Sequence, residues 1–571
     1  MSLCPVRILV IATLFIVAAF SSSYATESSS GLEKQLTVQE ILSLGEKMYR
    51  EGILPDGKPM AAFIRGDVEV DSRAFSCSSC HLRAGLGSVE GGVVTPPTTG
   101  KKLYQAYRRP PSLDDIPDKA GRYVYAKTVL ERPAYTRESL MHGLRFGEDP
   151  AGQKYNDVMP RYPLSDGDME ILVRYLELLS AEPSPGAGNK EFHFATVIAG
   201  EVSKEDRDAL LKPLLWFIDQ KNRQMALYQE FLKFDYSPTI DMRYAFHNAS
   251  LDIWELKGAP ETWEAQLAEY VRKKPVFAVL GGISNGSWQP VHRFCEQERI
   301  PCLFPITDFP VVSDSDWYTL YFNKGFFQEG EAAARYLNRQ QSENEAGRIL
   351  QVVEETAEGK ALAEGFNKAW ADLGHRAVNT VVVSQKDILE KGFIPSLMDK
   401  HRPQALVLWT DAWIFKTLKS AAGMIDKTTP VILSAGYLGQ KSLDADDAIR
   451  ERLYFTYPYR LTPYVGTKDG VRDVRVPIVA TYKDLGDRRI ASRTVSMLQQ
   501  AISRGLNLIY DNLYRDHLLD VMSMQMDMTV RDYERLSFGP GQRYGSKGCY
   551  IMQLGSGKEP AIIPVSDWVT H

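Results

Sequence analysis

The five residues Cys77-Ser78-Ser79-Cys80-His81 carry the most specific chemistry in this sequence. In this C-x-x-C-H pattern, each thiol can add to a vinyl group of haem while the imidazole binds the iron. The same residues would also suit half of a zinc site or a redox-active dithiol. A zinc site needs further ligands, and no second C-x-x-C occurs among the other cysteines, which are Cys4, Cys295, Cys302 and Cys549. The pattern favours one covalent haem c, with Cys77 and Cys80 as attachment points and His81 as the proximal iron ligand.

The N-terminal residues 1–25 predict export, which fits a haem that is attached outside the bacterial cytoplasm. Arg7 precedes an apolar run from Ile8 to Phe20, and small residues follow at Ser23 and Ala25. This is the pattern of a signal peptide cut after Ala25. A retained anchor is the alternative, but the run is too short to cross roughly 30 Å of hydrocarbon comfortably. We expect a periplasmic mature protein without a membrane span.

Length and charge set the scale of the protein. The 571 residues, 44% hydrophobic and 24% charged, suit a globular chain of two to four folding units. The net charge of -5 comes without a basic stripe, so nucleic acid is not an expected partner. Cys295 and Cys302 are close enough in sequence to form a disulfide in an oxidising compartment, which would leave Cys549 unpaired. Whether that bridge forms is left open by the sequence.

A Pro/Gly-rich stretch at residues 181–190 divides the chain. It reads Ala-Glu-Pro-Ser-Pro-Gly-Ala-Gly-Asn-Lys and has no apolar periodicity, which predicts an interdomain linker. The polar residues 26–35 predict a loose leader before the first domain.

Residues 37–180 have the helices of a small domain. Thr37 and Glu40 form a capping box ahead of an apolar stripe that includes Ile41 and Met48. Near the other end, Ser165 can cap a second helix. The buried stripe of that helix is Met169, Leu172, Val173, Leu176 and Leu179. The two helices are predicted to pack together, with Gly45 leaving room for an aromatic ring such as Tyr175.

A sixth iron ligand should come from a methionine or histidine. Met159 is the favoured candidate, because Pro160 and Pro163 hold its loop extended just before the final helix. The alternative for Met159 is a loop side chain that plugs the core. The other candidates are Met60, Met141, His142 and Met169.

These features resemble a monohaem class I cytochrome c domain. The resemblance covers residues 37–180 and rests on Gly45 to Tyr49, Cys77 to His81, Met159-Pro160 and the closing helix. It implies an all-α fold, with His81 proximal and Met159 distal, and an iron suited to electron transfer. The Gly/Pro-rich segment from Gly85 to Gly100 departs from that pattern, either as a docking surface beside the haem edge or as a plain insertion.

Residues 191–571 instead alternate short β-rich runs with amphipathic helices, which predicts two α/β lobes with parallel sheets. The expected strands are 192–200, 250–256, 276–282, 302–306, 348–353, 378–383, 405–409 and 431–434. The expected helices are 206–220, 262–273, 288–299, 328–337 and 360–373.

This order resembles the type I periplasmic binding proteins, in particular those that bind branched-chain amino acids for ABC transporters. The residues that carry the resemblance are Val276 to Gly282 with Ser284 and Ser287, Ile300-Pro301, Gln328 to Leu337, Glu358-Gly359, Glu364 to Phe366, Leu536 to Phe538 and Tyr550 to Met552. It implies a bilobal α/β domain. Glu358 stands where that family often has tyrosine, which puts an amino-acid ligand in doubt.

Such a fold binds small molecules between its lobes, at the carboxyl ends of strands. Each candidate side chain there could equally be an ordinary cap or turn residue. The candidates are Ser284, Asn285, Gly286, Ser287, Thr307 and Asp308 in the first lobe, and Glu355, Thr356, Asp411 and Tyr437 in the second.

No enzyme signature was found: the sequence has no H-E-x-x-H and no Walker loop. The leading hypothesis is periplasmic electron transfer through one haem c, with a redox partner protein and a second domain that binds a small molecule or docks a partner. The alternative is a ligand sensor or ABC-transport solute receptor in which the haem domain is a redox reporter.

Overall fold

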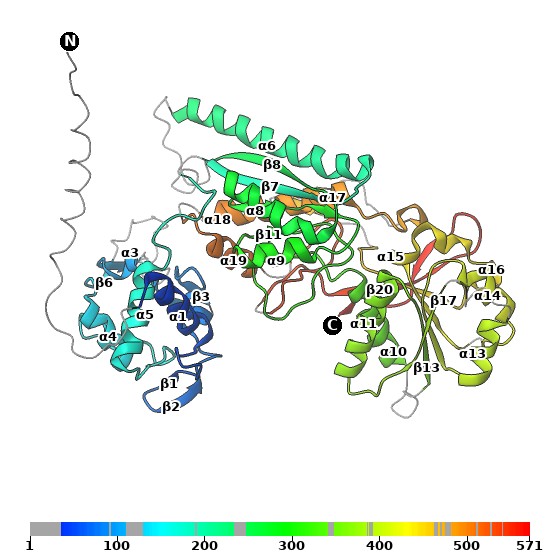
Figure 1. Ribbon diagram of the computed structural model, residues 1–571, viewed down its shortest axis with the longest axis horizontal. Helices are drawn as coiled ribbons and strands as arrows, with labels where there is room; N and C mark the ends of the chain where they lie inside the picture. Colours follow the sequence, from blue (N-terminus) through cyan, green and yellow to red (C-terminus); the bar gives the residue numbers. More distant parts are fainter. Residues whose placement is uncertain are drawn as a thin grey trace, which may run out of the picture. The chain divides into compact units, whose positions relative to one another are not determined.

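The computed structural model divides the chain into two compact units, Met1–Ala181 (unit 1) and Glu182–His571 (unit 2) (Figure 1). The structure describes residues 36–90, 93–109, 129–188, 191–232, 247–340, 348–384, 386, 392–426, 428–461, 466–468, 471–473, 481–509, 512–525, 528–539 and 541–570. The predicted signal peptide and leader lie outside the described residues.

Unit 1 combines helices with short antiparallel hairpins, so the all-α prediction was wrong. Its helices are α1 (Val38–Glu51), α2 (Cys77–His81), α3 (Gly100–Leu103), α4 (Arg137–Phe146) and α5 (Asp166–Leu178). Its hairpins pair β1 (Ala61–Ile64) with β2 (Val68–Asp71), β3 (Ser88–Glu90) with β4 (Val93–Thr95), and β5 (Tyr107–Arg109) with β6 (Val129–Arg132). These strands are three or four residues long, too short for their alternation to stand out from loop sequence.

The predicted caps of the two long helices are confirmed. Before α1, the Thr37 side chain accepts from the Glu40 backbone and the Glu40 carboxylate accepts from the Thr37 backbone, at 2.8 Å. Before α5, the Ser165 hydroxyl accepts from the Asp168 N–H at 3.1 Å. Both caps satisfy N–H groups that the first helical turn leaves without partners.

Helices α1 and α5 cross where Gly45 meets Tyr175, as predicted. A β-carbon built on Gly45 would lie 2.3 Å from Cβ of Tyr175. The two helices therefore pack with backbone against side chain, and the crossing closes over the core of unit 1, which contains Met48, Met169 and Leu172.

Replacing Gly45 with alanine is expected to destabilise unit 1 by about 2 kcal/mol, because the added methyl overlaps Tyr175 and a packed core relaxes only partly. Hydrogen exchange of amides in α1 and α5 should accelerate roughly 30-fold, the equivalent of that free energy. Gly167→Ala in α5 is the control, since nothing lies within 4 Å of the added methyl. Equal exchange in the two variants would contradict the tight crossing.

The first lobe of unit 2 (lobe A) is a parallel sheet covered by helices. Strand β7 pairs with three strands, β8, β9 and β10. Beyond β9 the sheet continues with β11 and then β12. All of these pairs are parallel. The strands are β7 (Glu191–Ala199), β8 (Asn248–Leu256), β9 (Ala278–Leu280), β10 (Ile283–Ser284), β11 (Cys302–Leu303) and β12 (Thr319–Leu320). The helices are α6 (Lys204–Leu232), η2 (Pro260–Thr262), α8 (Trp263–Lys273) and α9 (Gln289–Gln297).

Lobe A is completed by helices from late in the chain. Helix α17 packs against α6, and its residues Ile490 and Met497 share one hydrophobic core with Phe194 and Leu280 (Figure 1). These late helical segments are α17 (Ile490–Leu498), η5 (Gln499–Leu506), α18 (Asn507–Ile509) and α19 (Arg515–Ser523).

The second lobe (lobe B) has a sheet in the order β14-β13-β15-β16-β17-β20-β21, parallel from β14 to β17, with β20 and β21 antiparallel. Its strands are β13 (Ile349–Glu354), β14 (Asn379–Val383), β15 (Ala405–Trp409), β16 (Val431–Ser434), β17 (Leu453–Tyr457), β20 (Gly548–Leu554), β21 (Ile562–Pro564) and β22 (Val569–Thr570). Its helices are α10 (Phe326–Gln340), α11 (Ala357–Asp372), α13 (Phe393–His401), α14 (Ile414–Ala421), α15 (Ala435–Leu438), η3 (Gly439–Asp444) and α16 (Asp447–Arg450). A small hairpin, β18 (Gly466–Lys468) with β19 (Val471–Asp473), and η4 (Tyr482–Asp484) follow β17.

The chain passes between the lobes three times. It leaves lobe A after β12 to enter α10, returns after β17 toward α17, and crosses again into β20. The last crossing runs beside the first, since Gly545 and Ser546 donate to the carbonyls of Tyr321 and Phe322. The two predicted α/β lobes are therefore present, joined by three neighbouring connections.

The segment predicted as a linker is partly built into unit 2. The Ser184 N–H donates to the Leu513 carbonyl at 2.8 Å, and the His193 N–H donates to the Gly186 carbonyl at 2.8 Å. These bonds build residues 184–188 into unit 2, and the boundary between the two units, after Ala181, falls inside the predicted linker. Asn189 and Lys190 lie outside the described residues.

Candidate functional site

Four residues singled out in the sequence line a single cavity in unit 1. Cys77, Cys80, His81 and Met159 all face an empty volume of about 1110 Å³. This volume includes space that is open to solvent. Much of the remaining wall is apolar, and includes Phe75, Val93, Val94, Leu103, Leu140, Leu144, Val158, Tyr162 and Leu176.

The short helix α2 sets the positions of the two thiols. It comprises Cys77–His81, and residues three apart on a helix share a face, so both sulfurs lie on the cavity side. Burial raises the pKa of Cys77 to about 12, and both cysteines are free thiols in this structure. The helix ends at Leu82, whose φ of 63° turns the chain away.

The imidazole of His81 has one engaged nitrogen and one free nitrogen. Nδ1 lies 2.7 Å from the Pro96 carbonyl oxygen, which can only accept, so Nδ1 carries the proton. Burial lowers the pKa of His81 to about 4, so the ring is neutral at pH 7. Nε2 is buried and has no hydrogen-bond partner among the described residues. This arrangement, one N–H fixed by a carbonyl and one free lone pair, is that of a metal-binding histidine.

Among the candidates for a sixth ligand, Met159 alone lines the cavity that His81 lines. Met60 and Met169 are buried in the hydrophobic core of unit 1, and Met141 packs against that core. His142 is exposed and lies 3.5 Å from the Glu148 carboxylate. The tertiary structure thus favours Met159 over the other four.

The zinc alternative for these residues lacks ligands. Within the described ranges, no group of three or more His, Cys, Asp or Glu side chains is arranged to hold a metal ion. Cys77, Cys80 and His81 fit covalent haem attachment and axial ligation instead.

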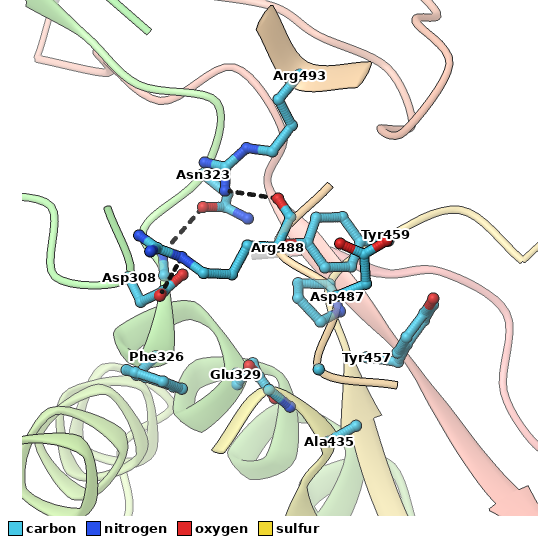
Figure 2. A pocket seen from close by; sticks show the side chains of 14 residues that line it. Asp308, Asn323, Phe326, Glu329, Ala435, Tyr457, Tyr459, Asp487, Arg488 and Arg493 are labelled. Atoms are coloured by element: carbon cyan, nitrogen blue, oxygen red, sulfur yellow. Dashed lines mark hydrogen bonds and ion pairs between the residues drawn. The ribbon is translucent and has the colours of Figure 1, made fainter. Parts of the chain in front are cut away.

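A second cavity lies in unit 2 between lobes A and B (Figure 2). Its empty volume is about 510 Å³. It stands at the carboxyl ends of parallel strands, where doubly wound folds place their ligands, because its walls follow β11 and β12 in lobe A and β16 and β17 in lobe B. The lining residues are Asp308, Asn323, Gly325, Phe326, Glu329, Ala435, Gly436, Tyr457, Pro458, Tyr459, Gly486, Asp487, Arg488 and Arg493.

Of the lobe A candidates, Asp308 lines this cavity and several others hold its wall together. The Arg488 guanidinium binds the Asp308 carboxylate at 3.0 Å, the Asn285 side-chain oxygen at 2.7 Å and the Ser284 carbonyl at 3.0 Å. The Thr307 hydroxyl donates to the Gly286 carbonyl at 3.4 Å. Ser287 instead accepts from the Gln289 N–H at 3.2 Å in an exposed turn, so its predicted ligand role is not favoured.

The lobe B candidates meet around a residue that the sequence did not single out. Glu354 accepts from the Tyr437 hydroxyl at 2.9 Å and from the Asp411 N–H at 2.8 Å, and Thr356 lies 3.0 Å from the same Tyr437 hydroxyl. Glu355 is exposed beside Lys360, so the strand presents Glu354 inward and Glu355 outward. Thr356, Asp411 and Tyr437 are thus brought together, but none of them lines the interlobe cavity.

Several residues of the cavity were missed. The most consequential are Asn323, Glu329, Arg488 and Arg493, which stand on a crossover loop, an early helical turn and the start of α17. The helical stripe that contains Glu329 carried a signal, since a charged residue within an apolar stripe is rarely buried without a reason. Arg488 and Arg493 had none, because they reach the site from about 180 residues beyond Asp308.

Glu329 forms a buried acid at the floor of the cavity. Its Oε2 accepts from the Ser434 hydroxyl at 2.8 Å and from the Thr456 hydroxyl at 2.7 Å. Burial raises the pKa of Glu329 to about 7, against the lowering effect of these hydrogen bonds. Near neutral pH this carboxyl therefore exists in both protonation states.

Glu329→Gln is expected to remove a pH dependence of the stability of unit 2. Between pH 4.5 and about 7 the unfolded chain ionises this acid while the folded chain keeps it protonated, so stability falls as pH rises through that window. The loss approaches about 3 kcal/mol above pH 7, at roughly 1.36 kcal/mol per pKa unit. Glutamine keeps the accepting oxygen and cannot ionise.

Urea unfolding followed by tryptophan fluorescence measures this in the full chain, because all nine tryptophans lie after Ala181. The difference between variant and wild type should be small at pH 4.5 and large at pH 8. A difference that stays constant with pH would mean that Glu329 does not titrate in this window.

Cys295 and Cys302 are adjacent, buried and unbridged. The thiol of Cys302 is a hydrogen-bond partner of Cys295, an interaction that, together with burial, raises the pKa of Cys295. The disulfide left open by the sequence is absent from this structure, and Cys549 is likewise a buried free thiol.

Searches for relatives place no family on this chain. No protein-family model and no curated protein match the sequence. Solved structures are similar at low identity. An ABC transporter substrate-binding protein from Sphaerobacter thermophilus is 14% identical over 67% of this chain and 98% of its own, with a TM-score of 0.46. A type 1 periplasmic binding protein from Bordetella pertussis Tohama I is 14% identical over 65% and 99%, with a TM-score of 0.42.

A branched-chain amino acid ABC transporter protein from Thermus thermophilus with bound valine is 13% identical, covers 67% of this chain and 97% of its own, and has a TM-score of 0.41. At this level of likeness only the chain's own residues bear on its function. No helix in the described part of the chain is both long and apolar enough to cross a membrane.

Proposed function

We propose that unit 1 is a class I cytochrome c domain that holds one covalent haem c. Cys77 and Cys80 would form the thioether bonds, His81 would be the proximal ligand and Met159 the distal ligand. The observation that carries this proposal is the cavity on which all four side chains converge, with the buried Nε2 of His81 left free. Bound there, the haem would supply a one-electron redox couple.

The residues of unit 1 fit electron transfer better than oxygen chemistry. His81 is oriented by Pro96, and Met159 is available for the position that an oxygen ligand would otherwise need. The apolar wall would limit the access of water to a haem bound there, and would thereby help to set its reduction potential. The partner in this role is a periplasmic redox protein, with export directed by residues 1–25.

Unit 2 is proposed to bind a small solute between its lobes, as type I periplasmic binding proteins do. The support is the position of the interlobe cavity at the carboxyl ends of strands from both sheets. This cavity favours the receptor alternative, in which ligand closes the lobes and the haem reports it. A ligand-dependent change in haem potential would identify a sensor, and an unchanged potential would identify an electron carrier with a solute-binding or docking module.

Mass spectrometry of the gently purified periplasmic protein tests both halves. A haem mass that survives denaturation supports thioether attachment. A second mass that is present under native conditions and lost on unfolding would be a solute held by unit 2. Protein made with a working haem-maturation system and found without covalent haem would overturn the cytochrome proposal.

A further inference from the structure

Arg493 is a buried cation at the interlobe cavity. It stands in the first turn of α17, its residue is 2% exposed, and its side chain points into the cavity beside Asn323 (Figure 2). Arginine is rarely this buried unless a carboxylate or another acceptor neutralises it.

No carboxylate contacts Arg493 within the described part of the chain. The nearby Asp308 is bound by Arg488, and Asp532 is bound by Arg489 and Ser492. Nη1 of Arg493 makes a long hydrogen bond of 3.4 Å to the Arg488 carbonyl, and Nε is buried without a partner among the described residues. The other close groups are the rings of Phe322 and Tyr533, each 5.9 Å from the guanidinium carbon. Asp308 and Asp532 therefore attract Arg493 through space and help to keep it charged, but both are held by other arginines and neither contacts its guanidinium.

Asn323 adds a second donor at the same place. Its residue is 6% exposed, and its side-chain oxygen accepts from the Gly325 N–H at 3.1 Å. That bond leaves the amide Nδ2 as the free end, close to Arg493 in Figure 2. A guanidinium beside an amide N–H matches the two oxygens of a carboxylate.

The rest of the cavity supplies apolar surface for the body of a ligand, but it supplies few negatively charged groups that could bind an ammonium group. Phe326, Tyr457 and Tyr459 supply aromatic surface. Glu329 accepts from Ser434 and Thr456 through Oε2, and burial raises its pKa to about 7, so its other oxygen belongs to an acid that is only partly charged at neutral pH. Asp308 is bound by Arg488. Asp487 is exposed and accepts from the Arg489 N–H at 2.8 Å, so its attraction for a cation is weakened by water.

We propose that Arg493, with Asn323, binds the carboxylate of a small apolar acid that lacks an α-amino group. The inference rests on the proposed solute-binding function of unit 2 and specifies its ligand class. It distinguishes this site from one for branched-chain amino acids, because the cavity presents a guanidinium and an amide to an anion, whereas Asp308 is bound by Arg488 and Glu329 is only partly charged at neutral pH.

Calorimetric titration of the full chain tests the ligand class with matched probes. The probes are 3-methylbutanoate and 3-phenylpropanoate, their α-amino counterparts valine and phenylalanine, and the neutral 3-phenylpropan-1-ol. We expect saturable binding of at least one of the two simple acids, at least tenfold weaker binding of its amino counterpart, and no binding of the alcohol.

Arg493→Gln should weaken binding of that acid at least about 30-fold, the lower end of the loss when one partner of a buried charge pair is removed. Arg223→Gln, an exposed arginine on α6 of the same lobe, should bind like wild type. Without ligand, Arg493→Gln should unfold at nearly the same temperature as wild type, because no carboxylate among the described residues contacts the guanidinium and the desolvation cost of the buried charge offsets its longer-range attractions.

Asn323→Asp is a second variant that does not depend on losing the arginine. Its carboxylate supplies a counter-charge next to the guanidinium, so the protein should unfold at a higher temperature and no longer bind the acids. If Asn323→Asp bound them as wild type does, or Arg493→Gln unfolded at a clearly lower temperature while still binding, Arg493 would be a structural residue.

The remaining outcomes separate this inference from the function it rests on. If neither acid bound wild type, or if valine or phenylalanine bound more tightly, the proposed ligand class would be wrong. If the neutral alcohol bound wild type and Arg493→Gln equally well, the proposed recognition of a carboxylate would be wrong, while solute binding by unit 2 would be supported. If, in addition, native mass spectrometry found no solute, the solute-binding function itself would fail.

Discussion

Replacing both Cys77 and Cys80 with alanine is expected to leave the protein without covalently attached haem. Both sulfurs line the cavity beside His81, and they are the two thiols within reach of a haem held there among the described residues. Without thioether bonds, any haem held by His81 and Met159 alone should dissociate when the protein is denatured. Denaturing mass spectrometry should therefore show a single mass, that of the polypeptide.

The single variants sharpen this expectation. Either Cys77→Ala or Cys80→Ala removes one of two bonds, so a lower yield of attached haem is expected from each. Cys549→Ala is the matched control, because that thiol is buried in unit 2 and should leave attachment intact. A double variant that still carried haem through denaturation would show that attachment uses other residues.

Replacing Met159 with alanine is expected to lower the reduction potential of the haem and to change its spectrum, while leaving attachment intact. A thioether ligand opposite histidine stabilises reduced iron and raises the potential. Its loss should shift the potential downward by a substantial part of the roughly 0.8 V range that axial ligands span. Spectroelectrochemical titration of the full chain measures the shift.

Met141→Ala is the control for this prediction. Met141 packs against the core of unit 1 without lining the cavity, so its loss perturbs packing and not ligation. A Met159→Ala protein with an unaltered spectrum and potential would exclude Met159 as a ligand and leave it as a residue that fills the cavity wall.

Sequence reasoning succeeded where the physical cause is local. The caps at Thr37 and Ser165 depend on residues three positions apart, and the cysteine spacing of α2 depends on a single helical turn. The contact between Gly45 and Tyr175 was also predicted, because a glycine on one amphipathic helix left room for an aromatic residue on the other. The alternation of strands and helices in unit 2 was likewise predicted, because the hydrophobic pattern that indicates each strand or helix lies within the residues of that element.

Prediction failed where partners are distant in sequence. Ser184 bonds to Leu513, so a stretch that is loop-like by composition is part of a folded unit. Glu354 rather than Glu355 gathers Tyr437 and Asp411, because which side chain of a strand end faces inward depends on the register of the whole sheet. The hairpins of unit 1 were missed because strands of three or four residues leave too short a pattern.

The sequence by itself determined the chemistry of the C-x-x-C-H helix, the N-terminal caps of α1 and α5 and the α/β pattern of the second unit, because these properties arise within a few neighbouring residues. The tertiary structure decided that Met159, and not Met169 or His142, shares the cavity with His81. It also placed Arg493 beside Asn323, with no carboxylate of the described residues in contact with its guanidinium. Both arrangements depend on where segments distant in sequence meet. Met159 and His81 meet through the packing of unit 1, and Arg493 and Asn323 meet where the connections between the lobes of unit 2 lie side by side.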